Sequence, residues 1–123
     1  MTERPWVLIA EDSSSMRLKL EKMVEALGFQ PVLAADGAAA IQQFDDVHPS
    51  IVLLDANMPE VDGLEVCRHI RAAGTETRVI MITADSRPEI VRDAIAAGAN
   101  DFVTKPFTSE RLKAALDRGL KAA

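Results

Sequence analysis

"WVLIAED" at residues 6–12 runs from β-forming apolar residues directly into two adjacent carboxylates, Glu11 and Asp12. The apolar part predicts a buried strand over residues 6–10, with both acids at its carboxyl end. If each acid is ionised about 4 Å from a third carboxylate, every like-charge pair costs about 4 kcal/mol at an effective dielectric near 20. We therefore expect either a cation beside these acids or their complete solvation.

Four more short apolar runs follow and alternate with segments of helical period. The runs are "PVLAA" at 31–35, "IVLLD" at 51–55, "VIMIT" at 79–83 and "DFVTK" at 101–105. Such alternation is typical of a parallel sheet with helices on both faces. The runs at 51–55 and 79–83 are almost continuously apolar, which predicts central strands buried on both faces.

The segments between the strands carry apolar residues at helical spacing. They predict helices over residues 16–27, 38–44, 64–70, 90–95 and 112–120, with a glycine placed to end the first, third and fourth. For the helix at 90–95, Ser86 and Glu89 have the spacing of a capping box, and Pro88 falls in its first turn.

Five such units with right-handed crossovers predict a doubly wound α/β fold. Its five-stranded parallel sheet takes the flavodoxin-like order 2-1-3-4-5 and is covered by five helices. Ligands of these sheets bind outside the carboxyl ends of the strands, near the switch point between strands one and three. The residues at those ends are three acids, a hydroxyl and an ammonium: Glu11, Asp12, Asp55, Thr83 and Lys105.

This set of side chains suits phosphoryl transfer onto a carboxylate. Mg²⁺ prefers oxygen ligands, so Asp12 and Asp55 would bind it directly and Glu11 through water. Asp55, at the centre of the sheet, would attack phosphorus, while Lys105 and the Thr83 hydroxyl would stabilise the equatorial oxygens. On this hypothesis a cation offsets the repulsion between the adjacent acids.

At these residues the chain resembles the receiver domain of bacterial two-component response regulators, and residues 1–123 would form one such domain. Its length is close to that of the single-domain chemotaxis type. The resemblance rests on "EDSSSMR", "LLDANMPEVDGLE", "MITA" and "GANDFVTKPF", in this order along the chain. Each segment alone is a weak signal, but the four in order at strand ends are highly specific.

The resemblance implies that Asp55 is phosphorylated by a sensor histidine kinase or a histidine phosphotransfer protein. It implies a Mg²⁺ site in which the backbone carbonyl of Asn57 joins Glu11, Asp12 and Asp55, and a cis peptide bond between Lys105 and Pro106. Thr83 and Phe102 would be the switch pair that converts phosphorylation into a changed surface for a downstream protein target.

The resemblance also implies two surfaces for partner proteins and a fast loss of the phosphoryl group. Kinase contacts are expected at Met16, Arg17, Leu20, Pro106 and Phe107, and downstream contacts at Val91, Ile95 and Thr104. Asn57 and Asp85 lie two residues after the acceptor and the switch threonine, where they would control the access of water. Because both are short and polar, we expect fast autodephosphorylation.

Composition excludes several other classes of protein. The length of 123 residues is that of one domain. The net charge is −5 and the basic residues do not cluster, which argues against binding of nucleic acid. No apolar run approaches the roughly 20 residues that span a bilayer, so no membrane contact is expected. A single cysteine, Cys67, is expected as a buried hydrophobe in a reducing, cytoplasmic setting. The helix over 112–120 lacks the dense pattern of arginines and acids of transcription-factor receivers that dimerise through this face, so the resemblance implies a monomer.

Other readings of single residues stay open. Arg17 and the segment 68–71 could be solvated helix surface, both histidines could be merely exposed, and Thr83 and Phe102 could serve packing alone. Two residues depart from the commonest pattern of the receiver family. The acidic pair is Glu-Asp, whereas Asp-Asp is commoner in the family, and Phe102 lacks the hydroxyl of the tyrosine that often occupies its position. The chain could be a stand-alone regulator or part of a longer protein.

Two other functions are considered. A haloacid-dehalogenase-like phosphatase also uses an aspartate nucleophile with Mg²⁺, but it needs a second aspartate where this chain has Asn57. A degenerate receiver that only binds a partner is the second, although every reactive position is filled here. Labelling with acetyl phosphate and Mg²⁺ would discriminate between the three.

Overall fold

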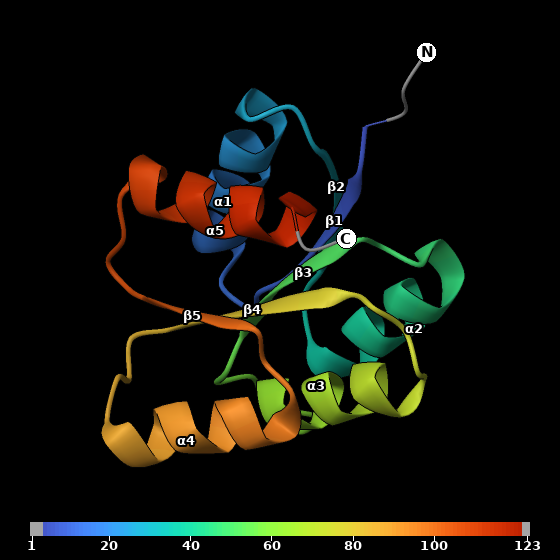
Figure 1. The fold of residues 1–123 in the computed structure, drawn as a ribbon, viewed down its shortest axis with the longest axis vertical. Coiled ribbons are helices and arrows are strands. Elements are labelled where there is room, and N and C mark those ends of the chain that lie inside the picture. The colour runs from blue at the N-terminus through green and yellow to red at the C-terminus, as the bar shows by residue number, and fades with distance from the viewer. Residues whose placement is uncertain (1–3, 122–123) are drawn as a thin grey trace.

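Strands and helices alternate along residues 4–121, which are the residues that the computed structural model describes. In chain order they are β1 (Trp6–Ala10), α1 (Ser14–Ala26), β2 (Gln30–Ala34), α2 (Gly37–Val47), β3 (Ile51–Asp55), α3 (Gly63–Ala72), β4 (Arg78–Thr83), α4 (Pro88–Ala97), β5 (Asp101–Thr104) and α5 (Ser109–Lys121). All strands are parallel, in the order β2-β1-β3-β4-β5 (Figure 1). The predicted α/β fold and strand order are confirmed.

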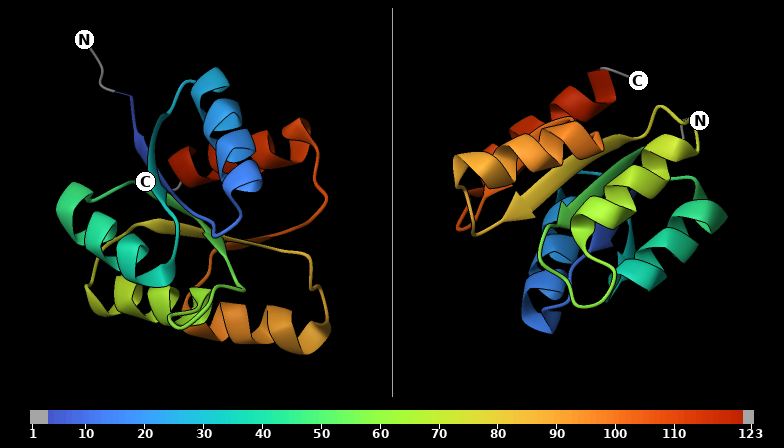
Figure 2. Two further views of the ribbon diagram at one scale, coloured as in Figure 1. Left: turned by 180° about the vertical axis from the view of Figure 1, so that it is seen from behind. Right: turned by 90° about the horizontal axis from the view of Figure 1, so that it is seen from below.

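The helices form a layer on each face of the sheet. Helices α1 and α5 lie on one face, and α2, α3 and α4 lie on the other (Figures 1 and 2). Alternate strand residues therefore pack into two separate cores, one around Leu20, Ile82 and Leu116 and the other around Phe44 and Met81. All of β3 and all but the first residue of β4 are buried, as predicted for central strands.

Side-chain caps set the start of the first three helices. Ser13, Asp36 and Asp62 each accept a hydrogen bond from the backbone N–H three residues later, at 3.3, 2.8 and 3.0 Å. Each such cap contributes about 1 kcal/mol to helix stability. These caps hold the helix N-termini beside the carboxyl ends of the strands, where the polar residues gather.

The capping box predicted at Ser86 is wrong. Helix α4 begins at Pro88 after Arg87, whose side chain makes no cap hydrogen bond. Instead, the Asp85 carboxylate accepts from the Arg87 backbone N–H at 3.2 Å and pairs with its guanidinium, with Nη2 and Oδ2 2.6 Å apart. The residue that precedes the helix is thus Arg87 and not Ser86, and Pro88 begins the helix without an N–H to satisfy.

Several predicted bounds shift by a few residues. Strand β2 covers 30–34 and β5 ends at Thr104, so Ala35 and Lys105 lie just outside the strands. Helix α2 extends to Val47, beyond the predicted end. The side chain of Leu120, predicted as part of the apolar face of the last helix, lies outside the described side chains. Within residues 4–121, every helix is too short or too polar to cross a bilayer.

Candidate functional site

Three carboxylates converge at the carboxyl edge of the sheet. Glu11 and Asp12 follow β1, and Asp55 ends the neighbouring β3. Each of the three offers a carboxylate oxygen within 4.8 Å of the others. Glu11 is 1% and Asp55 7% exposed, whereas Asp12 is open to solvent. The structure thus brings together the acids that the sequence predicted at one edge.

Lys105 places one positive charge beside these acids. It follows β5 and is joined to Pro106 by a cis peptide bond, as predicted. Its Nζ lies 2.7 Å from Glu11 Oε1 and 3.5 Å from Asp55 Oδ2. The ammonium therefore bridges the two buried acids, with the shorter contact to Glu11.

The two buried acids and the lysine shift one another's proton affinity. Burial, reinforced by the neighbouring Glu11 carboxylate, raises the pKa of Asp55 to about 6. Burial alone would raise the pKa of Glu11 too, but its neighbours Asp55 and Lys105 outweigh burial and lower it. Burial would lower the pKa of Lys105, but the two acids raise it. Three carboxylates thus face one ammonium, and this surplus of hard, negatively charged oxygens suits a divalent cation such as Mg²⁺.

Thr83 ends β4 beside this cluster and is completely buried. Its hydroxyl oxygen accepts the Asp85 backbone N–H at 3.1 Å and the Asn57 side-chain amide at 3.5 Å. The Asn57 backbone N–H donates to Asp55 Oδ1 at 3.1 Å. Asn57 therefore contacts both the central acid and the threonine hydroxyl.

Comparison with known proteins agrees with this geometry. The family model described as the response regulator receiver domain matches residues 7–117. This chain is a response regulator receiver domain. A relative, the chemotaxis protein CheY of Listeria monocytogenes, is 40% identical over 116 residues, which cover 94% of this chain and 98% of the relative.

Solved receiver structures share the fold. The chemotaxis protein CheY4 of Vibrio cholerae has a TM-score of 0.89 at 29% identity and covers 94% of this chain and 98% of its own. The receiver domain of the sensor histidine kinase PA1611 from Pseudomonas aeruginosa, solved with a magnesium ion coordinated in its active-site cleft, has a TM-score of 0.89 at 29% identity. It covers 97% of this chain and 99% of its own. With the family established, the haloacid-dehalogenase-like alternative is dropped.

A glycine that sequence reasoning did not single out shapes the receiver's acidic site. Gly63 begins α3, and a Cβ placed there would lie 2.4 Å from the Asp55 carbonyl oxygen and 2.8 Å from Ala56 Cα. Both neighbours are backbone atoms, so a side chain at Gly63 would displace the end of β3. The "DG" pair before the predicted third helix was the available signal, since it marks a cap followed by a residue without a side chain.

Phe102 is half-buried on the face that α2, α3 and α4 cover, and it packs against the core there. Its N–H donates to Asp101 Oδ1 at 2.8 Å, and its carbonyl accepts from Arg111 Nη2 at 3.0 Å. Beside the ring lies an open pocket of about 240 Å³, lined by Ile95, Ala99, Asn100, Asp101 and Phe102. On the adjoining surface Ile95 is 62% exposed, Thr104 is exposed and Val91 is half-buried.

Helix α1 presents only some of the kinase contacts expected from the sequence. Leu20 is 2% exposed and belongs to the core beneath α1 and α5, so it is unavailable to a partner and that expectation is wrong. Leu18, which the sequence reasoning missed, is 51% exposed. Met16 and Phe107 are half-buried, and Lys19 Nζ lies 5.7 Å from the centroid of the Phe107 ring.

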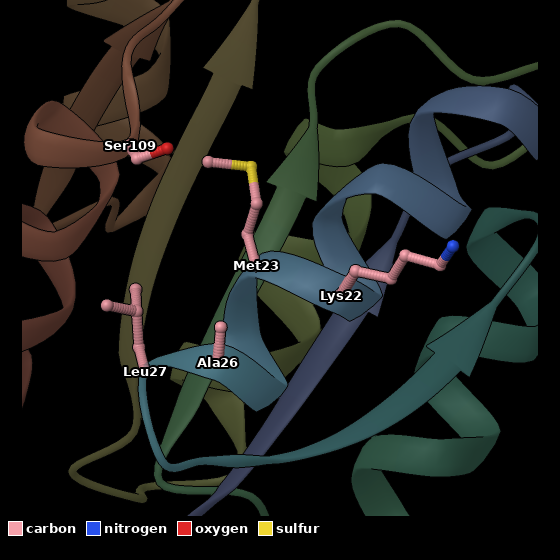
Figure 3. A pocket seen from close by; sticks show the side chains of 5 residues that line it. All are labelled: Lys22, Met23, Ala26, Leu27 and Ser109. Carbon is pink, nitrogen blue, oxygen red and sulfur yellow. The ribbon is translucent and has the colours of Figure 1, made fainter.

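A largely apolar pocket opens between α1 and the first residue of α5. It measures about 230 Å³ and is lined by Lys22, Met23, Ala26, Leu27 and Ser109 (Figure 3). In Figure 3 the Met23 and Leu27 side chains extend toward the Ser109 side of the pocket, whereas the Lys22 amine extends away from it. None of its lining residues belongs to the cluster of Glu11, Asp12 and Asp55, so the pocket is separate from that cluster.

Two arginines that the sequence suggested as solvated surface instead form hydrogen bonds within the protein. The Arg17 guanidinium donates from Nη1 to the Glu11 carbonyl at 2.8 Å. Arg71 donates to the carbonyls of Gly98 and Thr77, each at 2.8 Å, and to the side-chain oxygen of Asn100. Arg71 therefore joins the end of α3 to the end of α4, which corrects the prediction of a solvated face at 68–71.

The two histidines and Cys67 lie outside the group of residues that forms the acidic site. His48 is exposed, and His69 Nε2 lies 2.9 Å from Asp45 Oδ1 on the neighbouring helix α2. The expectation of two merely exposed histidines therefore holds for His48, whereas His69 is paired. Cys67 is fully buried, as predicted, and burial raises the pKa of its thiol.

Proposed function

We propose that this receiver domain is a signalling switch that accepts a phosphoryl group on Asp55. The donor would be the phosphohistidine of a sensor histidine kinase or of a histidine phosphotransfer protein. An Asp55 carboxylate oxygen attacks phosphorus, so that an O–P bond forms while the N–P bond breaks and its electron pair returns to the histidine nitrogen. The observation that carries the proposal is the Asp55 carboxylate at the end of the central strand, within 3.5 Å of the Lys105 ammonium and beside two further acids.

Asp12, Asp55 and the backbone carbonyl of Asn57 would hold Mg²⁺ directly, and Glu11 would hold it through water. When bound, the ion supplies positive charge that offsets the repulsion of the acids and the charge developing on the phosphoryl oxygens. The three carboxylate oxygens within 4.8 Å of one another support this assignment. The magnesium ion in the PA1611 receiver domain is a precedent in a protein of the same fold.

Lys105 and Thr83 would stabilise the transferred group. Lys105 is already within ion-pair distance of Asp55, and the Thr83 hydroxyl lies on the neighbouring strand next to Asn57. A phosphoryl group that draws the Thr83 hydroxyl toward it would leave space into which Phe102 could turn. Since Phe102 is half-buried beside an open pocket, such a turn changes the exposed surface.

Two surfaces would meet partners. The kinase or phosphotransfer protein would contact α1 and the loop after β5 through Met16, Arg17, Pro106 and Phe107, and the exposed Leu18 extends this surface. A downstream protein would bind the surface formed by Val91, Ile95 and Thr104, where Ile95 is the most exposed apolar side chain.

The domain would act as a monomer in the cytoplasm. Asp101, on the open edge of the sheet, is paired within the chain, with Arg118 Nη2 2.6 Å and Arg111 Nη2 3.4 Å from its carboxylate oxygens. These intramolecular pairs satisfy Asp101 without a second copy of the chain. Buried Cys67 is consistent with a reducing compartment.

Autodephosphorylation would be fast. Asn57 is exposed and Asp85 is half-exposed, and both side chains are short, so neither forms an apolar barrier to water. The rate can be measured as the loss of labelled protein after removal of the phosphodonor.

Mass spectrometry after incubation with acetyl phosphate and Mg²⁺ tests the proposal. One added phosphoryl group on Asp55, absent in Asp55→Asn, is the expected result. Sustained turnover of phosphomonoesters would indicate a phosphatase. No label in the folded parent would indicate a module that only binds a partner.

A further inference from the structure

We infer that Arg17 is a positioning residue for the cation site, a role distinct from the partner contact expected of it. This inference rests on the proposed Mg²⁺ site. Arg17 lies in the first turns of α1 and is half-buried, with its backbone N–H bonded to the Ser13 carbonyl at 2.8 Å. Its side chain turns back toward the end of β1 and donates to the Glu11 carbonyl at 2.8 Å.

Every polar group of Glu11 is held by a neighbour. Its N–H donates to the Ala34 carbonyl at 3.1 Å, and its carboxylate oxygens accept from Lys105 Nζ at 2.7 Å and from the Ser13 N–H at 3.1 Å. Its carbonyl oxygen is the last group to be satisfied, and Arg17 satisfies it. The peptide plane that contains this carbonyl is the one that joins Glu11 to Asp12.

Asp12 has no comparable support. It is exposed, and within residues 4–121 no hydrogen bond to its carboxylate is present. Asp12 is therefore positioned only through its own backbone, which begins with the peptide group that Arg17 holds. Because Asp12 is the open member of the acidic cluster, fixing this peptide preorganises the cluster for a cation.

Positioning and simple charge predict opposite effects when Arg17 is removed. The Arg17 guanidinium is a positive charge bonded to the backbone of the acidic pair, so its loss would strengthen cation binding if charge alone mattered. If Arg17 orients the peptide, its loss weakens binding even though Arg17 never touches the ion. Partners that orient metal ligands in this way typically change metal affinity 10- to 100-fold.

Isothermal titration of MgCl₂ into the full chain at constant ionic strength tests the inference. Arg17→Met keeps most of the apolar stem and removes both the charge and the donor, whereas Arg17→Lys restores a single donor. Lys22→Met is the matched control, because it removes one positive charge from the same helix at a residue outside the acidic cluster. We expect Arg17→Met to bind Mg²⁺ about tenfold more weakly, Arg17→Lys to recover most of the affinity and Lys22→Met to match the parent.

Thermal unfolding in EDTA supplies the second readout, and all variants should unfold within a few degrees of the parent. Mg²⁺ binding by Arg17→Met that equals or exceeds the parent's overturns the inference. So does a loss in Lys22→Met of the same size, or an Arg17→Met defect that Arg17→Lys does not correct. A parent chain that binds no Mg²⁺ contradicts the proposed metal site itself, and the inference falls with it.

Discussion

Asp55→Asn should stabilise the metal-free protein at neutral pH while abolishing phosphorylation. Asp55 is 7% exposed, and burial together with Glu11 raises its pKa to about 6. The asparagine keeps the size of the side chain and the oxygen that accepts the Asn57 N–H. It removes a buried negative charge that the fold accommodates poorly when no cation is bound.

The size of the effect follows from the pKa of Asp55. At about 1.4 kcal/mol per pKa unit, the rise from 3.8 to about 6 corresponds to about 3 kcal/mol. An acid with a raised pKa binds its proton more tightly in the folded chain than in the unfolded one. Its contribution to stability is therefore lost as the pH rises from about 4 to about 6, and the deficit persists above that range. Lys105 stays paired with Glu11 in the variant, since that contact does not involve Asp55.

Urea unfolding in EDTA at pH 7.5 and at pH 4 measures this difference. At pH 7.5 the free energy of unfolding of Asp55→Asn should exceed the parent's by up to about 3 kcal/mol, or about 10 °C in Tm for a domain of this size. At pH 4 the two proteins should be nearly equal, because the parent's Asp55 is then protonated in the folded state. Excess Mg²⁺ at pH 7.5 should reduce the gap by stabilising the parent.

Asp46→Asn is the matched control, because it removes an exposed carboxylate from α2. It should change stability by less than about 0.5 kcal/mol at either pH. An Asp55→Asn protein that is no more stable than the parent at pH 7.5, or whose advantage is the same at pH 4, would refute the reasoning.

Three further changes test the site and the fold. Asp12→Ala should weaken Mg²⁺ binding in calorimetry and slow labelling by acetyl phosphate, because it removes the open carboxylate; an unchanged titration would contradict the cation site. Arg71→Met should lower the free energy of unfolding by about 3 kcal/mol, because it removes three hydrogen-bond donors from the α3–α4 junction. Arg68→Met, at an exposed position of the same helix, should leave the free energy of unfolding nearly unchanged. Equal effects of the two substitutions would show that the Arg71 hydrogen bonds are unimportant. Thr83→Ala should still accept phosphate on Asp55 but fail to change partner binding; phosphorylated Thr83→Ala that bound a partner as tightly as the parent would exclude the proposed coupling.

The sequence by itself was sufficient for the architecture and for the polar residues that meet at the carboxyl edge of the sheet. Apolar runs and helical periods are local properties, so the strands could be placed to within a residue or two. The polar residues that end those runs then had to meet at one edge, because all the strands are parallel. Glu11, Asp55 and Lys105 were predicted together for this reason, and the structure brings them together.

Local patterns were less reliable where two of them competed. Ser86 and Glu89 have the spacing of a capping box, but the Asp85–Arg87 pair forms a turn around Ser86 and the helix begins after Arg87. Leu20 was predicted both as an apolar residue of its helix and as a partner contact, and only the first agrees with its burial. A sequence pattern gives the residues that can make an interaction but not which of two possible interactions forms.

Only the tertiary structure decided the individual contacts that distant groups make. It placed the Lys105 ammonium closer to Glu11 than to Asp55, turned Arg17 back onto the Glu11 carbonyl and joined Arg71 to the end of α4. These contacts depend on how the helices dock on the sheet and on the rotamers of long, flexible side chains. Neither quantity is encoded in the periodicity of a segment, because the same arginine on a helix surface can point to water or reach a carbonyl on a neighbouring element.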